Sequence, residues 1–169
     1  MTSLTVRPAT LADLEQITEI YNHYIRTSAI TFDIEPVTPT ERTGWFREHT
    51  AAPRYLLFVA DEGGRIRGYA GTGQFRGKAA YDTTAETTIY CAPTATGQGI
   101  GRLLYATLFE ALRGADLQRL VAGITLPNDA SLELHRRFGF REVGVFSENG
   151  RKFDRYWDVL WMERPLLLE

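Results

Sequence analysis

Apolar residues recur along this chain in short blocks, and the spacing within each block follows the period of either a strand or a helix. Strands are predicted where β-branched and aromatic residues run together or alternate between turn residues. The predicted strands are Leu4–Arg7 and residues 55–60, 66–75, 83–91, 120–124, 140–146 and 156–162. Four blocks with helical spacing lie between these strands. The chain therefore alternates between the two kinds of element rather than separating them.

Capping signals place the helix ends. Thr10 with Asp13, and Thr38 with Glu41, have the spacing of capping boxes, in which two side chains satisfy free N–H groups at a helix start. A third helix is predicted after Gly99, and a fourth begins at Asn128 or Asp129. The predicted order is β-α-α-β-β-β-α-β-α-β-β. Tight turns make the early strands antiparallel, whereas the later β-α-β unit requires a parallel pair.

These features predict an α/β fold with a mixed, mostly antiparallel central sheet flanked by helices on both faces. On the strand at 83–91 the side chains alternate, so two sets face opposite sides. One set is Thr84, Glu86, Thr88 and Tyr90, and the other is Ala85, Thr87, Ile89 and Cys91. The helix after Gly99 is predicted to bury Ile100, Leu103, Leu104, Leu108 and Leu112.

Composition narrows the class of protein. The 169 residues suit a single domain spanning 1–169, with 44% hydrophobic and 24% charged residues. A net charge of −2 argues against a nucleic-acid partner, and no apolar run is long enough to span a membrane. The single cysteine, Cys91, excludes an internal disulfide, and we expect a cytoplasmic protein. The three histidines lack ligand spacing, so no metal is expected.

A glycine-rich turn, Gly97-Gln98-Gly99-Ile100-Gly101, precedes the third helix. Glycine lets backbone N–H groups approach a ligand, and a helix N-terminus favours an anion, so the turn can hold a phosphate or pyrophosphate. Its spacing fits neither the dinucleotide fingerprint nor the Walker loop. A turn that only redirects the chain remains the alternative, and Arg102 would add positive charge if a phosphate binds.

The run Tyr90-x-x-Pro93-x-x-x-Gly97-x-Gly99-Ile100-Gly101 resembles the acetyl-CoA motif of the GCN5-related N-acetyltransferases (GNAT). A second run, Leu126-Pro127-Asn128-x-x-Ser131-x-x-Leu134-His135, resembles the other half of that signature. Stretches from about residue 5 to 165 are similar to the phosphinothricin N-acetyltransferase subfamily. The resemblance implies the acyl-CoA N-acyltransferase fold, acetyl-CoA as co-substrate and a homodimer.

The resemblance also implies site residues. The implied cofactor-binding residues are Ile89, Tyr90, Cys91, Gly97, Gln98, Gly99, Ile100, Gly101, Arg102, Asn128 and Ser131. Asn128 is equally explained as a plain helix cap. The family's glycine motif usually starts with Arg or Gln where this chain has Thr96, but a cradle of backbone N–H groups tolerates that difference.

Two residues are implied to be catalytic. Glu86 would remove a proton from the amine, although without the resemblance it reads as a polar residue on a solvated strand face. His135 would protonate the departing thiolate as an imidazolium, or would pack against the cofactor without proton transfer. Cys91 lies on the strand face opposite Glu86 and is not expected to be a nucleophile.

The implied substrate-binding residues are Phe32, Arg76, Lys78 and Tyr81. The subfamily usually has two arginines in this loop, and Lys78 replaces one of them. Lysine cannot form the two-pronged contact that arginine makes with an oxyanion. A solvated basic loop, and a core position for Phe32, are the alternatives.

The sequence therefore predicts an N-acetyltransferase that acts on the amino group of a small amino acid such as phosphinothricin, methionine sulfoximine or methionine sulfone. The alternatives are the same chemistry on another amine, such as another amino acid, a polyamine or a protein N-terminus, and a non-catalytic acyl-CoA sensor.

Overall fold

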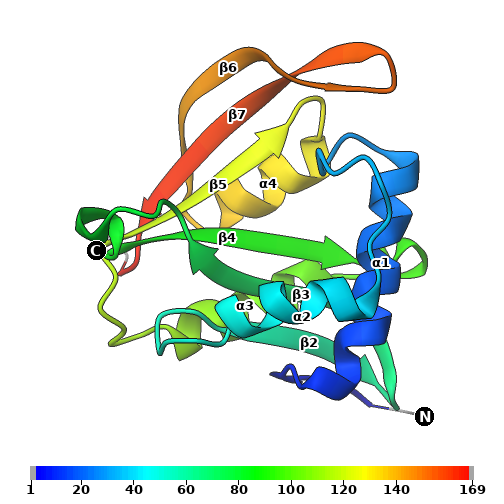
Figure 1. The fold of residues 1–169 in the computed structure, drawn as a ribbon. Helices are drawn as coiled ribbons and strands as arrows, with labels where there is room; N and C mark the ends of the chain where they lie inside the picture. The colour runs from blue at the N-terminus through cyan, green and yellow to red at the C-terminus, as the bar shows by residue number, and fades with distance from the viewer. Residues whose placement is uncertain (1–2, 168–169) are drawn as a thin grey trace.

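The computed structural model describes residues 3–167, and all of its strands belong to one seven-stranded sheet with the order β1-β2-β3-β4-β5-β7-β6 (Figure 1). Only β4 and β5 are parallel, and every other neighbouring pair is antiparallel. The strands are β1 (Leu4–Pro8), β2 (Leu57–Glu62), β3 (Arg65–Gln74), β4 (Thr84–Cys91), β5 (Arg119–Thr125), β6 (Arg141–Lys152) and β7 (Arg155–Pro165). The predicted fold class and element order are confirmed.

Four α-helices cover the two faces of this sheet. They are α1 (Leu14–Thr27), α2 (Pro39–Glu48), α3 (Ile100–Ala111) and α4 (Asp129–Arg137). Helices α1 and α2 pack on one face, where Tyr24 meets Tyr90 and Trp45 meets Tyr69. Helices α3 and α4 pack on the other face, where the hydroxyl of Tyr105 lies 2.9 Å from His135 Nε2. No helix within residues 3–167 has both the length and the apolar character needed to cross a membrane.

The helix starts follow the capping signals. Thr38 accepts a hydrogen bond from the Glu41 backbone N–H and the Glu41 carboxylate accepts one from Thr38, with Pro39 as the first helical residue. Asn128 caps α4 by accepting from the Ser131 N–H. The Thr10–Asp13 box starts a short 3₁₀ turn, η1 (Leu11–Asp13), which leads into α1. These caps are local contacts, which is why the sequence could place them.

One predicted core position is wrong. Leu103 is 39% exposed, whereas Ile100, Leu104, Leu108 and Leu112 are buried as predicted. Helix α3 packs its 100–104–108 row against β2 and β3, and Tyr105 rather than Leu103 fills the flank toward α4. Strand ends also shift by a few residues: β2 starts at Leu57 rather than at residue 55, and the β6–β7 hairpin is longer than predicted.

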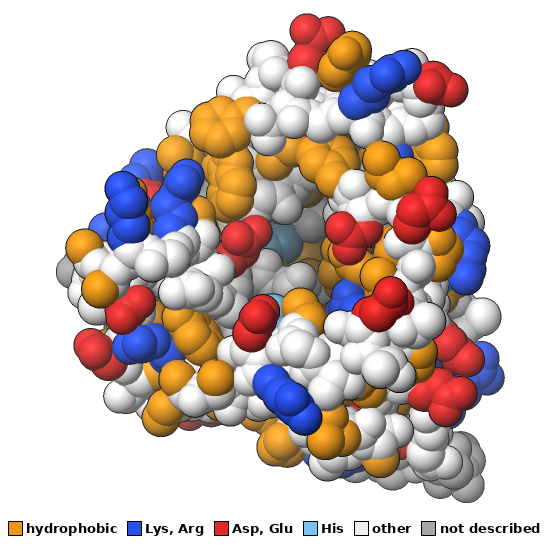
Figure 2. All heavy atoms as spheres, viewed as in Figure 1, with side chains coloured by type: hydrophobic (Ala, Val, Ile, Leu, Met, Phe, Trp, Pro, Cys, Tyr) orange, Lys and Arg blue, Asp and Glu red, His pale blue; other side chains and the backbone are white. Residues whose placement is uncertain are grey.

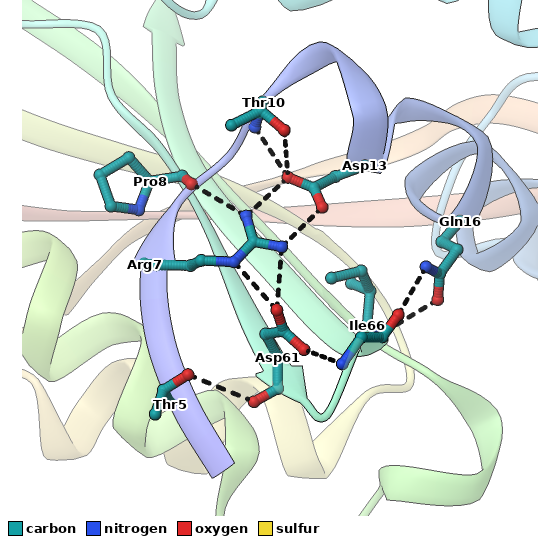
Figure 3. Close-up of polar contacts among 9 residues, drawn as sticks. Thr5, Arg7, Pro8, Thr10, Asp13, Gln16, Asp61 and Ile66 are labelled. Carbon is teal, nitrogen blue, oxygen red and sulfur yellow. Dashed lines mark hydrogen bonds and ion pairs between the residues drawn. The ribbon is translucent and has the colours of Figure 1, made fainter. Parts of the chain in front are cut away.

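A charged cluster ties β1 to its neighbours (Figure 3). Arg7 donates to both carboxylate oxygens of Asp13 at 2.7 and 2.8 Å, and to Asp61 on β2 at 3.0 Å. Asp13 also accepts from the Thr10 N–H at 2.7 Å. These hydrogen bonds, led by those from Arg7, lower the pKa of Asp13. The cluster therefore fixes the start of the first helix to the edge of the sheet.

The parallel pair is short. Strands β4 and β5 pair only from Thr84–Arg119 to Glu86–Val121, although both strands continue further. Beyond this point their arrows diverge in Figure 1. Thr87 Oγ1 donates to the Val121 carbonyl at 3.3 Å where the ladder ends, and the Tyr24 hydroxyl donates to the Cys91 carbonyl at 2.6 Å. Side chains thus satisfy backbone groups that the missing ladder would have paired.

Candidate active site

A narrow slot of about 70 Å³ opens between β4 and β5 where the two strands part. Residues 87–90 of β4 and 122–125 of β5 form its walls. Side chains from α3 and α4 close one end, and they are Tyr105, Asn128, Ser131 and His135. The facing strand edges form no ladder hydrogen bonds beyond Glu86 and Val121, so backbone groups between the Val121 and Cys91 carbonyls, which side chains satisfy, can bind a ligand.

His135 lies at the closed end of the slot and is 2% exposed. Its Nδ1 lies 2.7 Å from the Ser131 carbonyl, which can only accept, so Nδ1 carries the proton. Its Nε2 therefore accepts from the Tyr105 hydroxyl at 2.9 Å. Burial lowers the pKa of His135, and the imidazole is neutral at neutral pH. Of the two roles that the sequence left open for His135, burial disfavours the imidazolium that would donate a proton.

Glu86 shares a face of β4 with Thr88 and Tyr90, as predicted, and this face carries α1 and α2. Glu86 lines a cavity of about 510 Å³ with Glu48, His49 and Thr88. Burial raises the pKa of Glu86, and the charge of Arg76 partly opposes the rise. A partly desolvated carboxylate is a stronger base than a solvated one. Glu86 therefore has the environment that a general base requires.

A second cavity, of about 220 Å³, lies under the segment that joins α1 to α2. Thr88 lines this cavity, the Glu86 cavity and the slot, so the three spaces meet at that residue. The walls of the two cavities carry the carboxylates of Asp33, Glu41, Glu48 and Glu86. Figure 2 shows a hollow at the centre of this face with acidic side chains around it. Such a surface attracts a cationic amine.

The glycine-rich turn has a backbone that requires glycine. Gly99, the residue before α3, has φ of 79° and provides no side-chain cap for the helix. The first helical hydrogen bond runs from the Leu103 N–H to the Gly99 carbonyl, which leaves the N–H groups before Leu103 without an i−4 partner in the helix. A Cβ on Gly99 would meet no protein atom within 4 Å. The turn is thus an open site with N–H donors, suited to an anion.

Other residues of the predicted cofactor site serve the packing around this turn. Ile100 is 4% exposed and belongs to the core. A Cβ on Gly101 would lie 3.2 Å from Leu134, so glycine allows α3 to approach α4 closely. Gln98 folds back onto the turn, donating to the Thr94 carbonyl at 2.8 Å and accepting from Arg67 at 3.2 Å. These side chains shape the turn, while Gly97 and Arg102 are exposed on it.

Strand β4 divides the remaining predicted residues between its two faces. Ile89 and Cys91 face α3, where both approach Gly101. Tyr90 faces α1 and also lines the slot. Burial raises the pKa of the Cys91 thiol to about 11, so little thiolate forms at neutral pH. Cys91 therefore lacks the character of a nucleophile.

The predicted substrate residues are only partly brought together. Arg76 lies over the rings of Phe75 and Tyr81, at 4.9 and 5.8 Å from their centroids, and its charge acts on Glu86. Lys78 is exposed at the start of the 3₁₀ turn η2 (Ala79–Tyr81), and its side chain makes no hydrogen bond or ion pair with residues 3–167. Phe32 packs on the backbone of Gly150 in β6, and so links the α1–α2 segment to the β6–β7 hairpin.

Sequence reasoning missed Tyr105, Thr88 and Arg42. Tyr105 falls within the apolar period of α3 and looks like a core residue, and Thr88 looks like any polar strand residue. Arg42 precedes Trp45 by three positions, a spacing at which two side chains on a helix can contact each other. For these three residues, that spacing was the one sequence signal that could have indicated a role. Within residues 3–167 no group of three or more His, Cys, Asp and Glu side chains has an arrangement suited to a metal ion.

Comparisons with known proteins agree with this geometry. The model of the acetyltransferase (GNAT) domain matches residues 6–161. Phosphinothricin N-acetyltransferase of Streptomyces coelicolor is 55% identical over 163 residues, covering 95% of each chain. L-Methionine sulfoximine/L-methionine sulfone acetyltransferase of Salmonella typhimurium is 34% identical over 163 residues, covering 96% of this chain and 95% of the relative.

A solved structure shares the fold. It is a phosphinothricin acetyltransferase of the GNAT superfamily from Sinorhizobium meliloti in complex with acetyl-CoA, with a TM-score of 0.90 and 35% identity. The similarity covers 98% of this chain and 89% of that one. With its parted β4 and β5, its open glycine turn and these relatives, the chain belongs to the GNAT family of acetyl-CoA-dependent N-acetyltransferases.

Proposed function

We propose that this enzyme acetylates the α-amino group of a small amino acid whose side chain carries an oxyanion or a sulfone-like group. Phosphinothricin, methionine sulfoximine and methionine sulfone are the candidate substrates. The observation that carries the proposal is the junction at Thr88, where the Glu86 cavity meets the slot between β4 and β5. The names of the relatives from Streptomyces coelicolor and Salmonella typhimurium support this substrate class.

The residues present fit acetyl-CoA. The free N–H groups after Gly99 suit its pyrophosphate, and the unpaired strand edges of the slot suit the amide groups of its arm. Asn128 and Ser131 line the slot with polar atoms. When bound there, acetyl-CoA supplies a thioester that is already activated for attack. No nucleophilic serine or cysteine is then needed, in agreement with the raised pKa of Cys91.

Glu86 is proposed to act as the general base. The acceptor amine is an ammonium ion at neutral pH and must lose a proton before it attacks. Glu86 would take that proton directly or through a water molecule, and its raised pKa makes it a better acceptor than a solvated carboxylate. The surrounding carboxylates favour binding of the ammonium form, and Glu86 then converts it to the reactive amine.

Tyr105 and His135 are proposed to act together at the leaving sulfur. Because the Nδ1 proton of His135 is held by the Ser131 carbonyl, the mobile hydroxyl proton of Tyr105 is the one available in the slot. Tyr105 would donate it to the thiolate as that charge develops. Before that transfer His135, as a neutral acceptor, holds the Tyr105 hydroxyl in place, in contrast to the imidazolium role. The Tyr105 phenolate left after the transfer would regain a proton from water.

Arg76 and Tyr81 are proposed to contact the side chain of the substrate, since the charge of Arg76 acts on Glu86 and Tyr81 lies beside Arg76 and Phe75. Lys78 and Phe32 would contribute less directly, from the exposed loop and from the contact with Gly150. Arg76 offers a two-pronged donor to an oxyanion, which suits a phosphinate more than a sulfone.

We further propose that residues 1–169 form one domain that works as a cytoplasmic homodimer without nucleic-acid or membrane partners. Exposed apolar side chains on β6 and β7 support self-association, and they are Val143, Val145, Phe146 and Tyr156. The balanced charge of the chain supports the absence of a nucleic-acid partner. Light scattering of the purified protein measures the oligomeric state, and a monomer at micromolar concentration would contradict this assembly.

The function is tested by measuring release of free CoA from acetyl-CoA with a panel of amines. The panel contains phosphinothricin, methionine sulfone, methionine sulfoximine, ordinary amino acids, a polyamine and a peptide. The proposal predicts the highest kcat/KM for the first three. Faster turnover of a polyamine or a peptide N-terminus would identify the other amine class, and binding of acetyl-CoA without any turnover would identify a sensor.

A further inference from the structure

Arg42 in α2 is a buried cation held between two aromatic rings. Its guanidinium carbon lies 4.1 Å from the ring centroid of Tyr21 and 3.9 Å from that of Trp45. The side chain as a whole is only 7% exposed. A guanidinium that lies against aromatic rings keeps the N–H groups at its edge available to donate. The rings therefore fix the plane of the group without using its donors.

Those donors have no partner of normal geometry. Among residues 3–167, Arg42 forms no ion pair and no hydrogen bond of normal geometry, although the buried Tyr69 hydroxyl lies near its donors, and its Nε is buried without an acceptor. The carboxylates that share its cavity are engaged elsewhere. Asp33 accepts from the Tyr21 hydroxyl at 2.6 Å, and Glu41 accepts from the Thr38 N–H at 2.6 Å. A buried guanidinium without a counter-charge is costly, and an anion from outside the chain would offset that cost.

The cavity beside Arg42 can receive that anion. Its volume is about 220 Å³, and Arg42, Tyr69 and Thr88 all line it. Thr88 also borders the Glu86 cavity and the slot between β4 and β5. Glu86 and Thr88 are two positions apart on one strand face, which corresponds to roughly 7 Å. An anion at Arg42 thus shares a cavity with Thr88, which is the residue that joins this cavity to that of the general base.

The pocket has the charge pattern of a zwitterion. Arg42 supplies the positive edge, and Asp33 and Glu86 supply negative charge nearby. A carboxylate has two coplanar oxygens, which match the edge of a guanidinium. We propose that Arg42 is a substrate-binding residue that recognises the α-carboxylate of the acceptor amino acid, and so restricts this enzyme to amines that carry a neighbouring carboxylate. This inference rests on the proposed acetylation of an amino acid.

The test compares methionine sulfone with its α-carboxamide, which keeps the amine and the sulfone but lacks the negative charge. We measure kcat/KM for both in the wild type, Arg42→Met and Arg42→Lys. Methionine fills the space between Tyr21 and Trp45 without charge. Arg54→Met is the matched control, because Arg54 also lies near an aromatic ring, Tyr55, and also has a buried Nε without an acceptor, but it already has a counter-charge in Asp82 at 3.5 Å.

In Arg42→Met we expect kcat/KM for the acid to fall about 10–100-fold, mainly through KM, while the amide changes only a few-fold. Arg42→Lys should retain part of the preference for the acid, and Arg54→Met should retain all of it. Acetyl-CoA affinity, measured by calorimetry, should be unchanged in each variant. An equal loss for acid and amide would reduce Arg42 to a packing residue and overturn the proposal.

Two further measurements keep the outcomes distinct. In the wild type, the analogue of methionine sulfone without its amine should inhibit more strongly as a carboxylate than as an amide, and equal inhibition contradicts the proposal even if Arg42→Met does not fold. If the Arg42 variants instead change the ratio of kcat/KM for phosphinothricin and methionine sulfone, Arg42 contacts the side chain of the substrate and the proposal is wrong. A wild type that acetylates no amino acid would refute the proposed function itself.

Discussion

Replacing Tyr105 with phenylalanine removes one hydroxyl from the end of the slot and leaves the ring in place. That hydroxyl donates to His135 Nε2 at 2.9 Å, so the substitution leaves a buried acceptor without a partner. Tyr105 and His135 are 0% and 2% exposed. An unsatisfied buried acceptor costs about 1–3 kcal/mol of unfolding free energy. Because the adjoining slot of about 70 Å³ can admit a water molecule, we expect the lower part of that range, about 1–2 kcal/mol.

Urea unfolding followed by circular dichroism measures this loss. At about 2–4 °C per kcal/mol for a chain of this size, the melting temperature should fall by roughly 2–8 °C. Tyr156→Phe is the matched control, since Tyr156 is 58% exposed and its hydroxyl is accessible to solvent. A loss below about 0.5 kcal/mol for Tyr105→Phe would show that the hydroxyl is not paired with the imidazole.

The same substitution tests the proposed role in catalysis. Because a thiolate is a stable leaving group, we expect kcat to fall by about 100-fold, the lower end of the range for a positioned acid. The KM for acetyl-CoA should change little. A variant that loses stability but keeps the kcat of the wild type would restrict the Tyr105–His135 pair to a structural role.

Four other results are expected. Glu86→Gln should lower kcat by about 10²–10⁴-fold with unchanged acetyl-CoA affinity. In the wild type, kcat/KM should fall as pH drops through a pKa above the ordinary range of a glutamate. If the variant stays within a few-fold of the wild type across the pH range, Glu86 is not the base. Gly99→Val should abolish acetyl-CoA binding in calorimetry while the circular dichroism spectrum is retained. The φ of 79° favours glycine, and a branched side chain would block access to the backbone N–H donors. Undiminished binding would place the phosphates elsewhere. The lowered pKa of Asp13 adds to the free energy of unfolding at neutral pH, and this contribution is lost as pH falls below about 4. In Asp13→Asn the free energy of unfolding should therefore depend less on pH. An unchanged dependence would show that the contact of Asp13 with Arg7 adds no stability. Lys78→Ala should leave the ratio of kcat/KM for phosphinothricin and methionine sulfone within a few-fold of wild type, since the Lys78 side chain is exposed and unpaired within residues 3–167. A large change in the ratio would show that Lys78 contacts the anionic side chain of the substrate.

Local patterns in the sequence account for the elements and their ends. The Thr38–Glu41 box and the Asn128 cap act within three residues, so the chain carries them in any context. The strand period of two also placed Glu86 and Cys91 on opposite faces of β4, as the structure has them. The order of elements, together with short turns, was enough to predict a mixed sheet with helices on both faces.

The tertiary structure decided the features that depend on contacts between distant segments. The point where β4 and β5 part depends on how strands far apart in the sequence are placed in the sheet, where β7 holds the opposite edge of β5, and no local pattern encodes it. The exposure of Leu103 likewise depends on which side of α3 meets the sheet.

Charge and protonation at the site were also decided by packing. The sequence places a histidine at position 135 but does not say whether its imidazole is charged. In the fold, burial and the hydrogen bond from the Tyr105 hydroxyl keep the imidazole neutral. From the sequence alone, Arg42 looks like a solvated helix residue. In the fold, its guanidinium lies against the rings of Tyr21 from α1 and Trp45 from α2. The sequence by itself determined the elements, the faces of β4 and the glycine turn, because these follow from backbone geometry over a few residues. Only the folded chain determined which side chains lose their water, and that loss sets the acid–base and binding properties of the site.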